Sequence, residues 1–469
     1  MNPETILNRI TRALTALINA AEPYEGLFPS LLDRQTGAML TDLPPAIEGQ
    51  RNGDRAHLGS NLMHDEVTLK TCYALGQQDL TQAADQYLER FATHCTHTES
   101  GLFPWGEHAF WHLLDDRPGN SYIYNNPESP DRLIHDHLRA APLWLWQKLH
   151  AINPDCIQHF AEGLDNHWVE IEPLEYIRHA HIDKKNQRFT PTQTSCDFPR
   201  HGGFYIFDWA FAYTQSKRQE FIEQIRQMLD YWWEKRQPNG LLNTESRTHE
   251  GHFAYRMLAV AQTLSLGVSL LEAADLLDST HPDLTAEMRR RAHVYIEGFF
   301  AAPHDLDQAI FVSGFCKDAP QNDGNTMTIW GSYYGRTPAS YTALLSLCAY
   351  RLTQDNRFLS WAEAVGRCYL TTPFPTQTTV PAMDAGMGLG LLADLHDLTD
   401  DPLWLNLERA GELAEIYFDQ NDLPKGASNI DWYESQMGPG FLLHGLARLA
   451  LLSLHGRASC PLNADYTGR

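Results

Sequence analysis

Apolar residues recur along much of this chain at intervals of three and four positions, which is the spacing of one face of an α-helix. Residues 80–95 follow it with Leu80, Ala83, Ala84, Tyr87, Leu88 and Phe91. Residues 221–236 repeat it with Ile222, Ile225, Leu229, Trp232 and Trp233. Both segments are predicted to be amphipathic helices that bury one side.

Two kinds of helix are expected to alternate. The amphipathic kind is predicted at residues 3–21, 80–96, 154–168, 217–236, 284–301, 357–370 and 402–419. Each is followed by a kind richer in small and apolar residues, at residues 60–75, 131–150, 203–213, 250–266, 338–352, 384–398 and 435–454. Because the second kind should be more buried, the pattern predicts an all-α fold, an (α/α)7 toroid. If one of these helix pairs does not form a separate hairpin, the fold would be an (α/α)6 toroid instead.

The connections between these helices differ in length. Turns that leave the buried helices are short, at residues 76–79, 354–356 and 399–401, whereas those that enter them are mostly long, at residues 22–59, 97–130, 169–202 and 302–337. In consecutive hairpins the connections of one kind lie at one end. Long loops of this size usually serve a function. We therefore expect one built-up mouth that carries the chemistry and minor β structure, and one bare mouth.

Composition narrows the function classes. The chain has 469 residues, 43% of them hydrophobic, and lacks a Gly/Ser-rich linker, so we expect one domain over residues 1–469. No basic stretch with an apolar run opens the sequence, and no long apolar span is evident, which predicts a soluble, cytoplasmic protein without a signal peptide. The eight cysteines lack CxxC spacing, which argues against disulfides and a cysteine zinc site. A net charge of −23 disfavours nucleic-acid and membrane partners.

An anionic substrate would need local positive charge on such an acidic protein. Arginines stand in the predicted long loops, at Arg34, Arg51, Arg55, Arg117, Arg132, Arg200, Arg247 and Arg336. The alternative is that each one pairs with a neighbouring carboxylate. The sequence leaves both interpretations open.

The densest polar segment covers residues 243–256, where a long loop runs into a predicted buried helix. His249, His252 and Arg256 are three and four positions apart, so one helix face could direct them toward the mouth. Glu245 lies just before them. The segment is not an HExxH zinc motif, because its second histidine comes one position early. Helix capping by Thr248 is the alternative explanation for part of the segment.

A second polar segment, residues 321–336, combines amides, aromatic rings and a cation on a glycine-rich loop. Its candidates are Asn325, Trp330, Tyr333, Tyr334 and Arg336. Rings that stack on sugar faces, beside amides and arginine, are typical of a carbohydrate site. The alternative is an ordered loop whose tyrosines pack beneath it.

Two further loops hold candidate substrate-binding residues, at Trp105, His108, Asn120, Tyr124, Arg200 and His201. Histidines at 64, 135 and 137 add to an expected ring of imidazoles around the mouth. A metal could be held by members of a second set, Glu107, His108, His135, His137 and His201, although no spacing among them is diagnostic. We therefore expect no cofactor, with a divalent metal as the alternative.

On these residues the chain resembles the toroidal polysaccharide lyases, closest to polysaccharide lyase family thirty-eight, the alginate and glucuronan lyases. The resemblance rests on the predicted hairpins and on the Glu245 and His252 pair. It implies that a tyrosine, Tyr333 or Tyr334, acts as base and acid, and that Arg336 or Arg256 lies near the substrate carboxylate. The family two pectate lyases are similar too. Their metal is held by His and Glu next to a catalytic Arg, and Arg200 with His201 is the local match.

The resemblance implies a lyase that cleaves uronic-acid-containing poly- or oligosaccharides by β-elimination. That reaction removes the C5 proton beside a carboxylate, whose charge must be neutralised as the intermediate develops. His252 and a protonated Glu245 suit this task. A tyrosine base, with an ordinary pKa of about 10, needs a nearby cation such as Arg336.

Three other functions remain open from the sequence. Residues 249–252 loosely resemble the catalytic helix of N-acylglucosamine 2-epimerases, which would make the protein a sugar epimerase or isomerase. An (α/α) glycoside hydrolase needs two carboxylates that flank the scissile bond, and Glu107, Asp323, Asp384 and Glu434 could supply them. A non-enzymatic glycan-binding module would change no bond.

Overall fold

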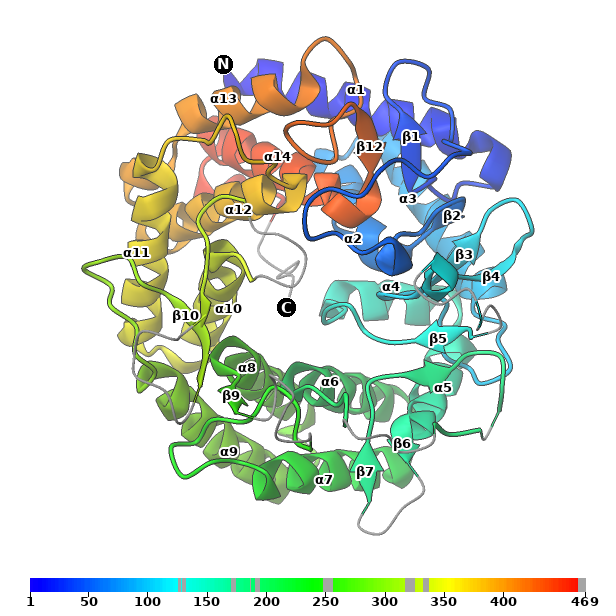
Figure 1. The fold of residues 1–469 in the computed structure, drawn as a ribbon, viewed down its shortest axis with the longest axis vertical. Helices are drawn as coiled ribbons and strands as arrows, with labels where there is room; N and C mark the ends of the chain where they lie inside the picture. Colours follow the sequence, from blue (N-terminus) through cyan, green and yellow to red (C-terminus); the bar gives the residue numbers. More distant parts are fainter. Residues whose placement is uncertain are drawn as a thin grey trace.

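A computed structural model of the chain describes all residues except 125–127, 129–131, 170–173, 186, 190–194, 248–255, 317–324, 332–336 and 463–469. Its helices form two concentric layers of a ring (Figure 1). The outer helices are α1 (Pro3–Ala21), α3 (Gln78–Arg90), α5 (Pro154–Gly163), α7 (Gln219–Glu234), α9 (Pro282–Phe300), α11 (Asn356–Thr371) and α13 (Leu407–Phe418). The inner helices are α2 (Leu62–Leu75), α4 (Leu143–Ile152), α6 (Pro199–Ser216), α8 (Val260–Leu277), α10 (Ala339–Thr353), α12 (Ala382–Thr399) and α14 (Pro439–His455). The predicted toroid of outer and inner helices is confirmed.

The two layers differ as their sequences require. Outer helix α7 buries Phe221, Ile225 and Leu229 on one side and exposes Glu223 on the other. In inner helix α12, by contrast, every residue from 384 to 396 is buried. Glycine allows α12 to approach α14, because a Cβ at Gly386 would lie 2.2 Å from a backbone nitrogen of α14. The inner layer is therefore packed on all sides, and the outer layer on one.

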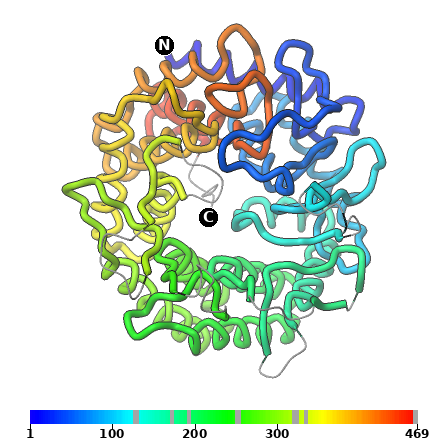
Figure 2. The backbone as a smooth tube through the Cα atoms, viewed as in Figure 1, coloured from blue at the N-terminus to red at the C-terminus, as the bar shows by residue number. Residues whose placement is uncertain are grey.

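The two ends of the chain close the ring. Helix α1 packs against both α13 and α14, and the backbone runs once around the ring between them (Figure 2). Strand β1 (Leu31–Asp33) pairs with β12 (Trp432–Glu434), so the first and last long loops share a sheet. Buried Arg55 bonds both carboxylate oxygens of Glu434, at 2.6 and 2.8 Å, beside that sheet. Closure thus uses helix packing, strand pairing and a buried ion pair.

The remaining strands all lie in loops that lead from outer to inner helices. They are β2 (Gly59–Ser60), β3 (Ala109–His112), β4 (Arg117–Asn120), β5 (Ile134–His135), β6 (Trp168–Val169), β7 (Glu175–Tyr176), β8 (Ala180–His181), β9 (Met257–Leu258), β10 (Val312–Cys316) and β11 (Asn325–Thr326). They lie over the near face of the ring in Figure 1, as sheets β2-β3-β4, β5-β8, β6-β7 and β9-β10-β11. The built-up mouth with minor β structure is therefore confirmed.

Two predicted inner helices were wrong in their bounds. The helix expected at residues 131–150 begins only at Leu143, because Ile134 and His135 form β5 and pair with β8. The helix expected at residues 250–266 is displaced to Val260–Leu277, since Met257 and Leu258 form β9 and the apolar run continues to Leu277. Both errors come from tertiary strand pairing, which overrides local helical periodicity.

Helix α8 is long and apolar enough to cross a membrane on those criteria alone, although no apolar span of that length was expected from the sequence. Its residues are 78% buried inside the ring, as in the core helix of a soluble protein. All eight cysteines are free, in agreement with the expectation from their spacing.

Candidate functional site

A cluster of acidic, imidazole and guanidinium groups lies in the built-up mouth. The β5-β8 pairing sets its core, because Ile134 faces His181 and His135 faces Ala180 in the antiparallel register. The next position in that register places Asp136 opposite His179. Gly106, earlier in the same connection as β5, brings a third segment against them, since a Cβ there would lie 1.7 Å from the carbonyl oxygen of Asp136.

Two arginines hold the carboxylates of this cluster. Buried Arg178 bonds Asp136 at 2.6 Å and Glu107 with the same nitrogen. Arg51 donates hydrogen bonds to both Glu107 and Asp54, and the distance from Arg51 Nε to the Asp54 carboxylate is 2.6 Å. The Glu107 backbone N–H also donates to Asp136, at 2.8 Å. The pairs fix the carboxylates and compensate much of their charge.

His108 is buried against these carboxylates. Its Nδ1 lies 3.0 Å from the Gly53 carbonyl oxygen, to which it donates, and 3.3 Å from Asp54. Burial disfavours the imidazolium, but Asp54, Glu107 and Asp136 outweigh it and raise the pKa of His108 to about 9. Burial raises the pKa of Asp136 to about 6, although His108 and Arg178 oppose the rise. Because Nδ1 is engaged, Nε2 of His108 remains available toward Asp136.

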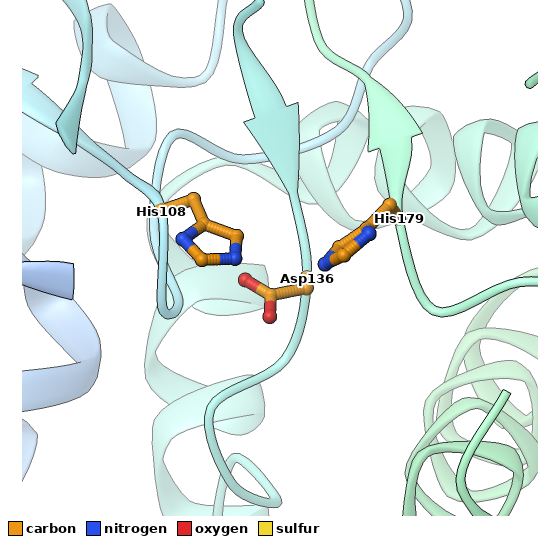
Figure 3. Close-up of side chains that lie close together, drawn as sticks. All are labelled: His108, Asp136 and His179. Carbon is orange, nitrogen blue, oxygen red and sulfur yellow. The ribbon is translucent and has the colours of Figure 1, made fainter. Parts of the chain in front are cut away.

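His179 faces the same carboxylate from the other side, so Asp136 lies between two imidazole rings (Figure 3). Burial, followed by the charges of Arg178 and His108, holds the pKa of His179 well below its usual range, so this ring is neutral. His108, Asp136 and His179 each offer one possible metal-ligand atom, and these three atoms lie within 4.8 Å of one another. Asp54, Glu107 and His108 form a second such group. Either set has the composition of a divalent metal site.

A chain of buried rings supports β5 from behind. The indole N–H of Trp105 donates to His135 Nε2 at 3.1 Å, so the proton of His135 must be on Nδ1. That proton is donated to His167, at 3.0 Å, and His167 in turn donates to the Ile177 carbonyl at 2.9 Å. Burial holds the pKa of His135 well below its usual range, in agreement with a neutral ring. Trp105 therefore lies in the core, and both nitrogens of His135 are already used.

Two other residues that the sequence suggested for a metal lie apart from these ligand groups. His137 pairs with Asp208 at 2.7 Å. His201 is buried, and neither of its ring nitrogens has a hydrogen-bond partner within the described part of the chain. Burial and the charge of Arg200 hold the pKa of His201 well below its usual range. Of the five predicted metal candidates, His108 and Glu107 belong to the ligand groups.

Arg200 lies in the first turn of α6, and Glu245 supports the turn that precedes this helix. Half-buried Arg200 forms no ion pair or hydrogen bond with any residue that the structure describes. Glu245 is 6% exposed and accepts a hydrogen bond from the Cys196 backbone N–H at 2.9 Å. Arg200 is thus a cation near the cluster that can meet an anion, and Glu245 holds the turn.

The other predicted site residues lie elsewhere in the mouth loops. Tyr124 bonds His57 at 2.7 Å, and Asn120 accepts the Tyr122 backbone N–H at 2.8 Å. Trp330 packs on the α11 side of the ring and donates to a backbone carbonyl at 3.2 Å. Asn325 and Arg256 are exposed. His249, His252, Tyr333, Tyr334 and Arg336 lie outside the described residues.

Most of the loop arginines pair with carboxylates, which was the alternative left open from the sequence. Such pairs are described for Arg34, Arg51, Arg55, Arg117 and Arg247. The cluster also includes Arg178 and His179, which sequence reasoning missed. They form the same Arg-His dipeptide that drew attention at Arg200 and His201, so the sequence did carry a signal for them.

Comparisons with known proteins support the fold. No family model and no curated protein sequence matches the chain. A sugar epimerase from a ruminal bacterium is 10% identical, with a TM-score of 0.50 over 97% of this chain and 99% of that one. An unsaturated glucuronyl hydrolase specific for heparin is 12% identical, with a TM-score of 0.46 over 96% and 98%. A glycoside hydrolase family 76 mannosidase from Bacteroides thetaiotaomicron is 12% identical, with a TM-score of 0.43 over 97% and 100%. At 10% identity, the likeness to the epimerase supports the toroidal fold alone and leaves the activity to the site.

Proposed function

We propose that this protein is a polysaccharide lyase that cleaves uronic-acid-containing poly- or oligosaccharides by β-elimination. The observation that carries the proposal is the convergence of His108, Asp136 and His179 beside the buried guanidinium of Arg178. In the family two lyases that the chain resembles, a metal held by His and Glu lies next to a catalytic Arg. Arg178 beside His108, Asp136 and His179 supplies the same residue types here, with an aspartate in place of the glutamate.

The residues fit a divalent metal ion. The Nδ1 atom of His108 is engaged by a backbone carbonyl, which is a common way to orient a ligating imidazole. Because the pKa of His108 is raised to about 9, a metal ion would have to displace the proton on its Nε2. Nε2 of His179 is buried and has no hydrogen-bond partner among the described residues. Each oxygen of Asp136 accepts a hydrogen bond and still has a lone pair to offer. A divalent ion held there would withdraw electrons from the substrate carboxylate and so acidify its C5 hydrogen.

The side chains of the site supply the remaining requirements of the elimination. Glu107 and Asp136 hold the pKa of Arg178 well above its usual range despite burial, so the guanidinium stays charged. It can therefore stabilise negative charge that develops on the substrate. Arg200, which has no ion-pair partner within the described ranges, suits a uronate carboxylate. We assign the base to Tyr333 or Tyr334, as expected from the sequence.

The proposed reaction balances without an oxidant or reductant. The base takes the proton from C5, and the electrons of that C–H bond form a double bond between C4 and C5. The bond from C4 to the bridging oxygen breaks, and that oxygen leaves with a proton. The product is an unsaturated uronate, which absorbs ultraviolet light.

An activity assay on glucuronan, alginate, polygalacturonate and ulvan tests the proposal. A rise in ultraviolet absorbance on one of them is expected, and it should disappear after EDTA treatment and return with Mn²⁺. New reducing ends without that rise would indicate a hydrolase, and interconversion of free sugars would indicate an epimerase. Either outcome would refute the lyase.

A pair of histidine variants locates the activity. His179→Ala should abolish turnover, because it removes a proposed ligand beside Arg178. His181→Ala is the matched control, since His181 lies two residues further along the same segment, in β8, and stacks on Phe189. Equal losses in the two variants would show that the effect reflects the strand rather than the site.

A further inference from the structure

The turn at residues 195–198, which precedes α6, has an unusual backbone. Cys196 has a φ of +50° and Phe198 a φ of +44°, and neither residue is a glycine. Side chains with a Cβ rarely adopt this left-handed region, because the Cβ approaches the carbonyl oxygen. Two such residues in one short turn need strong support from their surroundings.

That support comes from three segments of the chain. The Cys196 backbone N–H donates to Glu245, at 2.9 Å, and its carbonyl accepts the Arg178 N–H at 3.0 Å. Asp197 accepts the Ser246 N–H at 2.9 Å and the Tyr231 hydroxyl at 2.7 Å. A turn held from Arg178 just before β8, from α7 and from the 245–247 loop is over-determined, so its strained conformation is enforced.

The enforced turn directs two side chains into the candidate site. Phe198 lies under the guanidinium of Arg178, with 5.1 Å between Cζ and the ring centroid. The Cys196 sulfur lies 3.9 Å from Nδ1 of His179. A single turn therefore contacts both residues of the Arg178 and His179 pair.

The tautomer of His179 follows from these contacts. A neutral imidazole carries one proton and places it on the nitrogen that has an acceptor. Nδ1 has the sulfur within hydrogen-bond range, whereas Nε2 has no hydrogen-bond partner in the described structure. Donation from Nδ1–H to the sulfur is the arrangement that leaves the lone pair of Nε2 on the Asp136 side, where a metal ion can bind it.

We propose that Cys196 is a positioning residue, whose sulfur accepts a hydrogen bond from His179 Nδ1–H and thereby leaves Nε2 free to bind a divalent metal ion. The inference rests on the proposed function in that it takes His179 as a metal ligand. It adds a role for the thiol and explains why the strained turn is built. Hydrogen-bond partners of ligating histidines commonly set metal affinity in this way.

Titration of the full-length protein with Mn²⁺, followed by the electron paramagnetic resonance of the free ion, tests this role. Mn²⁺ prefers oxygen and nitrogen ligands to thiolates, so a loss of affinity cannot reflect a lost sulfur ligand. Cys196→Ala should weaken Mn²⁺ binding by about 10-fold or more. Cys196→Gly should weaken it similarly while raising the unfolding temperature, because glycine relieves the strain at this φ.

The matched control is Gln354→Gly. Gln354 has a φ of +59° at the end of α10, on the bare side of the ring, and is remote from the cluster in sequence. Its replacement should raise stability in the same way and leave Mn²⁺ affinity unchanged. A similar loss of affinity in this variant would refute a specific role for the thiol.

The tautomer provides a second measurement that needs no metal. In protein labelled with ¹⁵N-histidine, long-range ¹⁵N–¹H spectra should show His179 protonated on Nδ1, with His179→Gln for assignment. Cys196→Ala should shift it toward the other tautomer. If the wild-type protein binds no Mn²⁺, the metal site in the proposed function is refuted. The proposed role of Cys196 in metal binding is then refuted with it. If it binds Mn²⁺ and neither affinity nor tautomer depends on Cys196, the positioning role alone is overturned.

Discussion

The buried pair of Arg55 and Glu434 should make a large contribution to ring closure. Both side chains are 0% exposed, and the two residues come from opposite ends of the sequence. The carboxylate also accepts hydrogen bonds from Gln50 and Trp432, each at 2.9 Å. We consider three variants, Arg55→Met, Glu434→Gln and the double substitution, all of which roughly conserve side-chain volume.

The expected magnitudes follow from burial. Removal of one partner from a buried ion pair leaves an uncompensated charge and costs about 3–5 kcal/mol. Against a typical free energy of unfolding of about 5–15 kcal/mol, that loss is about a fifth or more of the total. The double variant leaves no unpaired charge, so it should lose at least about 2 kcal/mol less than the sum of the two single losses.

Urea unfolding, followed by tryptophan fluorescence, measures these free energies. Arg117→Met is the control, because Arg117 is 66% exposed and pairs with the half-exposed Asp115. Its loss should stay below about 1 kcal/mol. If the single losses simply add in the double variant, or if they match the surface control, the reasoning from a coupled buried pair is wrong.

Three further predictions concern single residues. Trp105→Phe removes the N–H donor to buried His135 and should cost about 1–3 kcal/mol with KM unchanged, whereas a large rise in KM would make Trp105 a substrate contact. Burial raises the pKa of Asp65 to about 7, so its contribution to stability is present below its ordinary pKa of 3.8 and is lost as pH rises through 7. Asp65→Asn should therefore flatten the fall in unfolding midpoint between about pH 4 and about pH 8. Gly106→Ala should abolish activity and lower the melting temperature, because its Cβ would overlap the Asp136 carbonyl oxygen.

The sequence contained enough information for the toroid, because each helix carries its own pattern. The apolar stripe of residues 221–236 and the small, apolar run at residues 384–398 depend only on local spacing, and both helices were predicted within a few residues. The long loops were also assigned to the correct mouth. That conclusion needed only the order and length of the connections.

The cluster itself could not be predicted from local patterns, because it depends on contacts between distant segments. Asp136 and His179 are 43 residues apart in the numbering, and they meet only because β5 pairs with β8. Because residues 131–150 were predicted to form a helix, strand β5 was not predicted. Without that strand, nothing in the sequence indicated that the two loops meet. A two-residue strand has no periodicity to detect. His108 was among the predicted residues, but its partners were not identified.

The closure of the ring has a consequence during synthesis. Helix α1 is made first, yet its apolar residues, such as Ile6 and Leu14, pack in part on α13 and α14, which are made last. At roughly 5–20 residues per second, the nearly 400 intervening residues take on the order of 20–80 s. Throughout that time, part of the first helix has no native neighbour to cover it. The newly made helix α1 is therefore a segment in need of a chaperone, and truncated chains that lack the last hairpin should aggregate through it.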